Sequence, residues 1–291
     1  MLLTMRREVI AVRKGSIIFG TFDGLHKGHF EVLRQAELPA TVITFPYPPA
    51  MEEEKELLLS PLLKKNRLLE NGFSVRILDF SKVSHIEAED FLEKMDAEYK
   101  PKIMCCGFNY RFGHCGKGNA ALIKRFCEER GIEAKILPVV EQDGVRISSS
   151  FIRDLIKRGE VEKANKLLTR PFSISGEVLH GDSRGRTIGH PTVNFFYPEE
   201  IVKARHGVYA AACSIEGKRY TAVTYVGNRP TYELDRCIVE TNLLGFSGDL
   251  YGKHIEIELL SFLREEKKFD SLDELKAQIE SDIASAQQKN T

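Results

Sequence analysis

A glycine-rich stretch near the N-terminus reads Gly20-Thr21-Phe22-Asp23-Gly24-Leu25-His26-Lys27-Gly28-His29 and directly follows the apolar run Ser16-Ile17-Ile18-Phe19. The apolar run predicts a short buried strand, and apolar side chains at helical spacing predict a helix over 29–36. Open α/β sheets bind nucleotides where a strand passes into a helix, because the first N–H groups of the helix are free to meet phosphate. The stretch therefore predicts a phosphate site.

Two histidines in this stretch, His26 and His29, are three residues apart. If helical geometry begins there, both imidazoles can face one spot, and Gly20 and Gly24 permit close approach of the backbone. Such an arrangement suits a polyphosphate whose charge grows during a transfer reaction. A helix cap would explain one histidine, but not the pair together with the glycines.

Strand-like and helix-like segments alternate from this stretch outward through the first half. This alternation predicts an α/β domain, in which helices cover a parallel sheet. The expected strands cover 40–45, 75–80, 102–106 and 134–140, and the expected helices cover 60–70, 88–95 and 120–130. A polar helical pattern over 153–168, broken at Gly159, follows them.

The pattern changes after Pro171, where short Val, Ile, Tyr and Thr runs alternate with Gly, Pro and Asn turns. The runs cover 173–179, 208–215, 219–225, 237–244 and 254–262. Such spacing predicts an antiparallel barrel or sandwich. We therefore predict two domains, 1–168 and 169–291.

The final segment, 271–287, begins with the capping box formed by Ser271 and Glu274. An apolar stripe follows on one helical face and predicts a terminal helix that packs against the barrel. The stripe consists of Leu272, Leu275, Ile279 and Ile283.

The composition argues against several classes of protein. The 42 basic and 42 acidic residues balance, whereas a nucleic-acid partner normally requires a basic surplus. The chain contains no apolar run of about 18 residues that would span a membrane, and 1–12 lacks the apolar core of a signal peptide. We therefore expect a cytoplasmic protein with no nucleic-acid or membrane partner.

Six cysteines are spaced in no zinc-binding pattern. Cys105, Cys106, His114 and Cys115 form a candidate metal cluster. The simpler interpretation, which we favour, is a buried strand with reduced thiols.

A second hydroxyl-rich and basic segment, Arg146-Ile147-Ser148-Ser149-Ser150-Phe151-Ile152-Arg153, lies at an expected helix start. Taken alone, it indicates an N-cap serine with solvated arginines. Paired with the histidine stretch, it indicates the other wall of a triphosphate site.

Another glycine-rich segment, 181–194, lies on the β framework of the second half. Gly185 and Gly189 let backbone N–H groups approach phosphates. Thr192 and Asn194 alternate, so both can offer oxygen ligands to Mg²⁺ from one face of an extended segment. A hairpin turn explains the spacing equally well. The segment lacks the Gly-Lys-[Ser/Thr] of a P-loop.

The pattern Gly-x-Phe-Asp-Gly-x-His-x-Gly-His, with Ile147-Ser148-Ser149-Ser150 and Arg153, resembles nucleotidyltransferases with a histidine-pair signature. It is similar to the adenylyltransferase half of bacterial bifunctional riboflavin kinase/FAD synthetases. The segment 107–113 resembles that family's middle motif. The resemblance implies a Rossmann-like nucleotidyltransferase sheet, catalytic roles for His26 and His29, and Mg²⁺ on the leaving pyrophosphate. It implies nucleotide contacts by Gly20, Phe22, Asp23, Asn109, Ser148, Ser149 and Arg153.

The second half resembles the flavokinase part of the same family through Gly185-Arg186-Thr187-Ile188-Gly189-His190-Pro191-Thr192-Val193-Asn194 and through 206–210, 226–231, 248–252 and 264–269. The resemblance implies that Glu240 is the catalytic base and that Thr192 and Asn194 hold Mg²⁺. It also implies ligand contacts by Gly185, Thr187, Gly189 and Arg264. The activity implied is phosphorylation of riboflavin to FMN with ATP, followed by adenylation of FMN to FAD.

Three residues differ from the usual family pattern. Tyr47 replaces a common His, His190 a common Phe, and Asn242 a common His or Tyr. Two alternatives to the bifunctional enzyme stay open: a riboflavin kinase with weak or altered adenylyltransferase activity, and a flavin-sensing regulator without catalysis. The sequence leaves the oligomeric state open.

Overall fold

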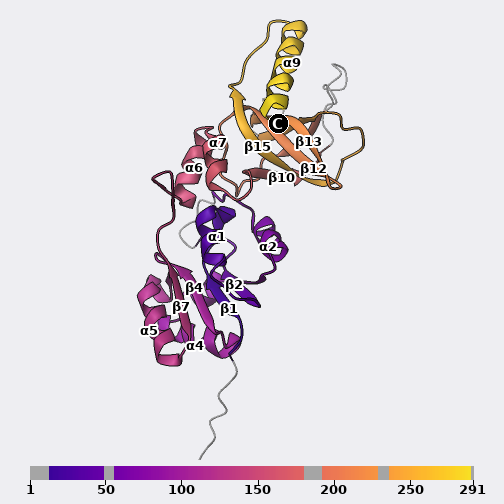
Figure 1. Ribbon diagram of the computed structural model, residues 1–291. Helices are drawn as coiled ribbons and strands as arrows, with labels where there is room; N and C mark the ends of the chain where they lie inside the picture. Colours follow the sequence, from indigo (N-terminus) through magenta and orange to yellow (C-terminus); the bar gives the residue numbers. More distant parts are fainter. Residues whose placement is uncertain (1–12, 49–55, 180–191, 229–235, 290–291) are drawn as a thin grey trace, which may run out of the picture. The chain divides into compact units, whose positions relative to one another are not determined.

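A computed structural model describes residues 13–48, 56–179, 192–228 and 236–289 (Figure 1). The internal contacts of these residues divide them into two compact units. The first unit comprises 13–22, 28–48 and 61–146, and the second comprises 23–27, 56–60 and the described residues from 147 onward.

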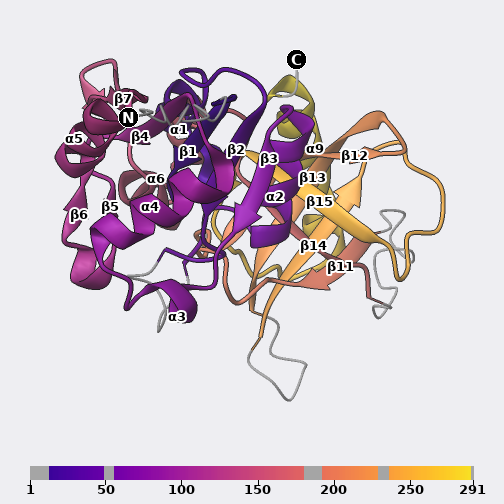
Figure 2. The same cartoon turned by 90° about the horizontal axis from the view of Figure 1, so that it is seen from below.

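The first unit contains a five-stranded sheet whose strands are all parallel, in the order β3-β2-β1-β4-β7. In Figure 2 the strand labels follow this order from right to left. The predicted α/β fold with a parallel sheet is confirmed. The strands are β1 (Ser16–Phe19), β2 (Ala40–Thr44), β3 (Ser74–Ile77), β4 (Ile103–Gly107) and β7 (Glu133–Leu137).

Four longer helices accompany this sheet: α1 (Lys27–Leu33), α2 (Pro61–Glu70), α4 (Ala88–Tyr99) and α5 (Ala120–Arg130). Apolar residues of α4 and α5 form one core cluster with alternate residues of β1 and β4. The cluster includes Ile17, Phe19, Met104 and Cys106 from the strands, and Phe91, Leu92, Ile123 and Phe126 from the helices.

Two strand predictions ran too far along the chain. The extended segment expected over 75–80 ends at Ile77, because Asp79 accepts a hydrogen bond from the Ser81 N–H at 3.1 Å and starts the short helix α3 (Phe80–Val83). The segment expected over 134–140 ends at Leu137. The turns also contain small elements that the pattern did not indicate. These are η1 (Asp23–Leu25), β5 (Arg111–Phe112), η3 (His114–Gly116), β6 (Gly118–Asn119), β8 (Glu141–Gln142) and β9 (Val145–Arg146).

The second unit contains a six-stranded antiparallel sheet in the order β10-β15-β12-β13-β14-β11. An antiparallel bridge between Leu179 and Asn194 connects the two edges of this sheet, so it closes as a barrel rather than a sandwich. The strands are β10 (Ser173–Glu177), β11 (Thr192–Phe196), β12 (Gly207–Ile215), β13 (Lys218–Asn228), β14 (Cys237–Leu243) and β15 (His254–Arg264).

The terminal helix α9 (Leu272–Lys289) packs against β12, β13 and β15, as predicted (Figure 1). The Glu274 N–H donates to the Ser271 hydroxyl at 3.2 Å, which confirms the predicted cap. The predicted apolar stripe is only partly right, because Leu272 is 57% exposed and the buried residues are Asp282 and Ala286. Asp282 can be buried because it forms an ion pair with Arg264 of β15, at 2.8 Å.

Two helices, α6 (Ser149–Lys157) and α7 (Val161–Leu167), belong to the second unit. They are separated at Gly159, which has a φ of 80°, as the sequence indicated. The Asn165 side chain of α7 donates to the Leu259 carbonyl at 2.9 Å and accepts from the Phe172 N–H at 2.8 Å. These bonds fix α7 to the barrel. The predicted domain division at 168/169 concerns independent folding and stays a prediction.

The cysteine interpretation is confirmed for Cys105 and Cys106, which are buried on β4. Burial raises the pKa of each thiol to about 12, so both are neutral thiols. Among the described residues, no group of three His, Cys, Asp or Glu side chains is arranged to hold a metal ion. None of the described helices combines the length and the apolar character that crossing a membrane requires.

Candidate functional sites

The loop after β1 has a fixed and unusual backbone. Phe22, Gly24 and Leu25 have φ values of 53°, 80° and 45°. These values lie in the left-handed region, which residues other than glycine rarely occupy. A Cβ atom on Gly24 would lie 2.8 Å from the Leu58 side chain, so only glycine fits there. Strained backbone of this kind persists where surrounding contacts hold it, and it is frequent at binding sites.

The carboxylate of Asp23 is the centre of those contacts. Arg153 Nη1 donates to Asp23 Oδ2 at 2.7 Å, with the two side chains only 9% and 2% exposed. The Leu58 N–H donates to Asp23 Oδ1 at 2.9 Å, and the Ser149 hydroxyl donates to the Asp23 carbonyl at 3.0 Å. The structure therefore joins the histidine stretch to the serine–arginine motif. The ligand contacts predicted for Asp23, Ser149 and Arg153 stay predictions.

His26 lies in the same part of the second unit and is 6% exposed. Burial lowers its imidazole pKa to about 4, and the positive charge of Arg153 shifts the pKa in the same direction. His26 is consequently neutral at pH 7, and a neutral imidazole carries one N–H.

Gly20, Phe22, His29 and Asn109 belong to the first unit. The His29 ring packs edge-on against the Phe22 ring, with centroids 5.3 Å apart. Gly20 follows β1 and the exposed Asn109 follows the adjacent strand β4, so both lie at the carboxyl edge of the sheet, as a nucleotide site requires. The predicted convergence of both histidines stays a prediction.

Ser148 has the structural role that the sequence left open. Its hydroxyl accepts a hydrogen bond from the Phe151 N–H at 3.3 Å and caps α6. Its predicted contact with a nucleotide stays a prediction.

The second candidate site lies on the barrel, where the predicted oxygen donors meet. Asn194 of β11 is opposite Glu240 of β14, and Thr192 is opposite Asn242. The Thr192 hydroxyl donates to Glu240 Oε1 at 2.9 Å. Asn194 Oδ1 is buried and accepts no hydrogen bond from the residues that the structure describes. Glu240 is partly buried and hydrogen-bonded on this face, and its role as the catalytic base stays a prediction.

Arg264 lies at the end of β15 and is held by a residue that the sequence did not single out. Its Nε donates to both carboxylate oxygens of Asp282 at 3.0 Å, and its Nη2 donates to Asp282 Oδ2 at 2.8 Å. The available signal was an acidic residue three positions after Ile279, which places Asp282 on the helix face that carries Ile279. Its partner was not indicated by the sequence.

Tyr225 was also missed. It is opposite Glu240 on the neighbouring strand β13, and its hydroxyl donates to Glu266 Oε1 at 2.6 Å. Tyr225 lies beside Glu240 because β13 pairs with β14. The alternation of residues within one strand does not predict which strands pair.

Comparison with known proteins covers both parts of the chain. A family model described as FAD synthetase matches residues 10–151, and one described as riboflavin kinase matches 168–290. The bifunctional riboflavin kinase/FMN adenylyltransferase of Bacillus subtilis is 33% identical over 286 residues, which cover 92% of this chain and 90% of that protein. The chain belongs to the bifunctional riboflavin kinase/FMN adenylyltransferase family.

Other relatives agree with this family. The Escherichia coli K12 protein of the same name is 34% identical over 294 residues, covering 96% of this chain and 94% of its own. A crystal structure described as a macrolide-efflux protein from Streptococcus pneumoniae matches with a TM-score of 0.84 and 32% identity, covering 94% of each chain. The likeness thus extends over both the adenylyltransferase part and the riboflavin kinase part.

Part of the predicted kinase site falls outside the described residues. Gly185, Thr187, Gly189 and His190 all lie in 180–191.

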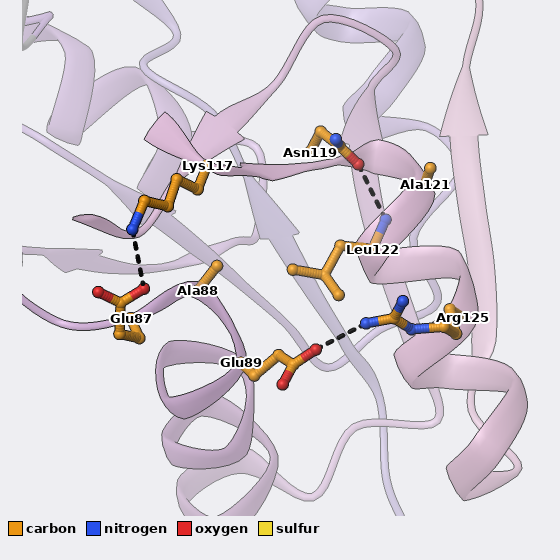
Figure 3. A pocket seen from close by; sticks show the side chains of 8 residues that line it. All are labelled: Glu87, Ala88, Glu89, Lys117, Asn119, Ala121, Leu122 and Arg125. Carbon is orange, nitrogen blue, oxygen red and sulfur yellow. Dashed lines mark hydrogen bonds and ion pairs between the residues drawn. The ribbon is translucent and has the colours of Figure 1, made fainter. Parts of the chain in front are cut away.

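A pocket of about 610 Å³ lies elsewhere in the adenylyltransferase part, between the N-terminal ends of α4 and α5 (Figure 3). Two exposed ion pairs, Lys117–Glu87 and Arg125–Glu89, flank it. None of the predicted site residues lines this pocket.

Proposed function

We propose that this chain phosphorylates riboflavin to FMN with ATP in 169–291, and adenylates FMN to FAD with release of pyrophosphate in 1–168. The observation that carries the proposal is the row formed by Thr192, Asn194 and Glu240 on paired strands. These three residues are the ones to which the family resemblance assigns the metal ligands and the base of the kinase.

Glu240 is the proposed general base of the kinase reaction. It takes the proton of the riboflavin 5′-hydroxyl as that oxygen attacks the γ-phosphate of ATP, the bond from the γ-phosphorus to the bridging oxygen breaks, and ADP leaves. The hydrogen bond from Thr192 to Oε1 fixes the orientation of the Glu240 carboxylate. Arg264, fixed by Asp282, is proposed to lie near the bound flavin and nucleotide.

The same row fits a Mg²⁺ ion. Asn194 Oδ1 is a buried oxygen that accepts no hydrogen bond from any described residue, and the Thr192 oxygen has lone pairs left after donating to Glu240. Neutral oxygens suit Mg²⁺, which usually keeps water and nucleotide phosphates among its ligands. The bound ion would supply positive charge beside the transferred phosphoryl group. The buried Asn194 oxygen supports the assignment of both residues to the metal.

In the adenylyltransferase reaction no side chain acts as a nucleophile. The FMN phosphate attacks the α-phosphate of ATP, and we propose that His26 and His29 donate hydrogen bonds to the triphosphate as negative charge grows. Gly20, Phe22 and Asn109 are proposed to contact the nucleotide. The buried Asp23–Arg153 pair, with Ser148 and Ser149, is proposed to hold the loop shape and to contribute to phosphate binding.

One incubation tests the proposal against both alternatives. Purified protein receives riboflavin, ATP and Mg²⁺, and FMN and FAD are separated by chromatography. We expect FMN first and FAD later. FMN without FAD would indicate a kinase with weak adenylyltransferase activity, and binding without either product would indicate a flavin sensor.

A magnesium titration tests the metal assignment. Thr192→Ala and Asn194→Ala should each raise the Mg²⁺ and ATP concentrations needed for half-maximal FMN formation, while FAD formation from supplied FMN is unchanged. Ser214→Ala is the control, because Ser214 is exposed on β12, a strand that pairs with neither β11 nor β14. Unchanged titrations in both variants would contradict the assignment.

A further inference from the structure

Lys64 places a buried positive charge beneath the carboxyl edge of the parallel sheet. It lies on α2 and is 2% exposed. Its ammonium donates to the carbonyl oxygens of Thr21 at 2.9 Å, Phe45 at 2.6 Å and Pro46 at 3.5 Å. Burying an ammonium is costly, so these acceptors must compensate for the water that it loses.

These carbonyls belong to the two loops where adjacent strands leave the sheet. The pairing of β1 with β2 ends with the hydrogen bond from the Gly20 N–H to the Ile43 carbonyl, at 3.3 Å. The pairing of β2 with β3 ends where the Thr44 carbonyl accepts from the Leu78 N–H, at 2.8 Å. Among the residues that the structure describes, no strand pairs with the backbone beyond those positions, so its carbonyls need other donors. The Thr44 hydroxyl is a second donor to the Thr21 carbonyl, at 3.0 Å.

The orientation of the Thr21 carbonyl determines that of the next N–H. In a planar trans peptide the carbonyl and the following N–H point in opposite directions. While Lys64 holds the Thr21 oxygen, the N–H of Phe22 points away from Lys64, and the negative end of the peptide dipole is turned onto the ammonium. A loop in this orientation presents donors, rather than carbonyl oxygens, to an anion on its other side.

We propose that Lys64 is a positioning residue of the adenylyltransferase site. It orients the Gly20–Phe22 backbone for the triphosphate and ties that segment to the loop of Phe45 and Pro46. This inference rests on the proposed FMN adenylyltransferase activity. Lys64 acts through the backbone and does not touch the substrate.

The test compares Lys64→Met, which keeps the aliphatic stem and removes every donor, with Lys64→Gln, which keeps an amide donor without charge. Lys65→Met is the matched control, because Lys65 is the exposed neighbour on the same helix. For each full-length protein, FAD formation from FMN and FMN formation from riboflavin are measured separately. Both are measured at a temperature where circular dichroism shows the native state.

We expect Lys64→Met to reduce kcat for FAD formation by roughly 30-fold, because small misplacements of a site can cost up to about 10²-fold. The KM values for ATP and FMN should change less than kcat. Lys64→Gln should have a kcat between those of Lys64→Met and the wild type. Its unfolding midpoint should be close to that of the wild type. The kinase reaction of all variants and both reactions of Lys65→Met should be unchanged.

Wild-type kcat in Lys64→Met would overturn the inference. If Lys64→Met fails to fold, Lys64→Gln decides: a lowered kcat at a native midpoint supports the inference, and a wild-type kcat overturns it. The wild-type protein in the same assay separates the two proposals, because absence of FAD there would contradict the adenylyltransferase activity itself.

Discussion

The two candidate sites are built in different ways. At the kinase site, Thr192, Asn194 and Glu240 lie on two regular, hydrogen-bonded strands, and Asn194 keeps a buried oxygen without a described donor. At the adenylyltransferase site, Asp23, His26 and Arg153 lie on a strained loop and a helix, and Asp23 and Arg153 neutralise each other in the interior. Strand pairing places the first set, whereas buried polar contacts place the second.

This difference predicts different responses to mutation. A strand residue can be replaced with little change to the ladder, because backbone hydrogen bonds hold the strand. A loop residue that satisfies a buried charge also determines the loop shape, so its loss affects stability and activity together. Substitutions at the kinase site should therefore lower activity with little change in stability.

The largest expected effect belongs to the histidine pair. Changing His26 and His29 together to Ala should reduce FAD formation from FMN by about 10⁴-fold, since each well-placed donor can contribute about 10²–10³-fold. FMN formation from riboflavin should continue in the same sample. His254→Ala, at an exposed position on β15, is the control. FAD formation at the wild-type rate in the double variant would place the first site elsewhere.

The next effect concerns the kinase base. Glu240→Gln should lower kinase turnover by roughly 10³-fold, within the usual range for general-base catalysis. Riboflavin binding and the unfolding midpoint should stay close to the wild-type values, because Gln can still accept the Thr192 hydrogen bond. Turnover is measured by FMN formation and binding by flavin fluorescence. Near-normal turnover would disprove the role of Glu240.

An effect of pH on stability should appear at the loop site. The pKa of His26 is about 4 in the folded protein and about 6.5 in an unfolded chain, so the unfolded state binds the extra proton first as pH falls. His26 should cost no stability above pH 6.5 and lower the free energy of unfolding by up to about 3 kcal/mol between pH 6.5 and 4.

Urea unfolding at pH 7 and pH 5 measures this effect. His26→Gln should reduce the loss of stability between the two pH values, and His254→Gln should not. An equal loss in wild type and His26→Gln would show that burial does not keep His26 neutral.

The smallest effect concerns the connection between the barrel and α7. A fragment of 172–291 retains Thr192, Asn194, Glu240 and Arg264, and should fold and make FMN but no FAD. A fragment of 160–291 also retains α7 with the two hydrogen bonds of Asn165 and omits Arg153, and it should be more stable by about 2 kcal/mol. Urea unfolding of both fragments checks this difference. A folded fragment without kinase activity would mean that the kinase site requires residues from the first half.

The sequence predicted the elements of both sites better than their contacts. Alternation within β11 placed Thr192 and Asn194 on one face, and the family resemblance selected Glu240 as their companion. The sequence did not predict that Asp23 would meet Arg153, 130 residues later, or that Asp282 would meet Arg264, because those pairs depend on how loops and helices pack. The sequence does not distinguish Lys64 from Lys65, although of these two lysines only Lys64 is buried.

Complementation between two variants, each of which lacks one activity, tests most directly whether one chain carries two separate sites. The Glu240→Gln protein and the His26→Ala/His29→Ala protein are each incubated with riboflavin, ATP and Mg²⁺, alone and then mixed. FMN should accumulate with the histidine variant, neither protein alone should yield appreciable FAD, and the mixture should produce FAD. A mixture that makes FMN but no FAD, or FAD from the histidine variant alone, would contradict the account.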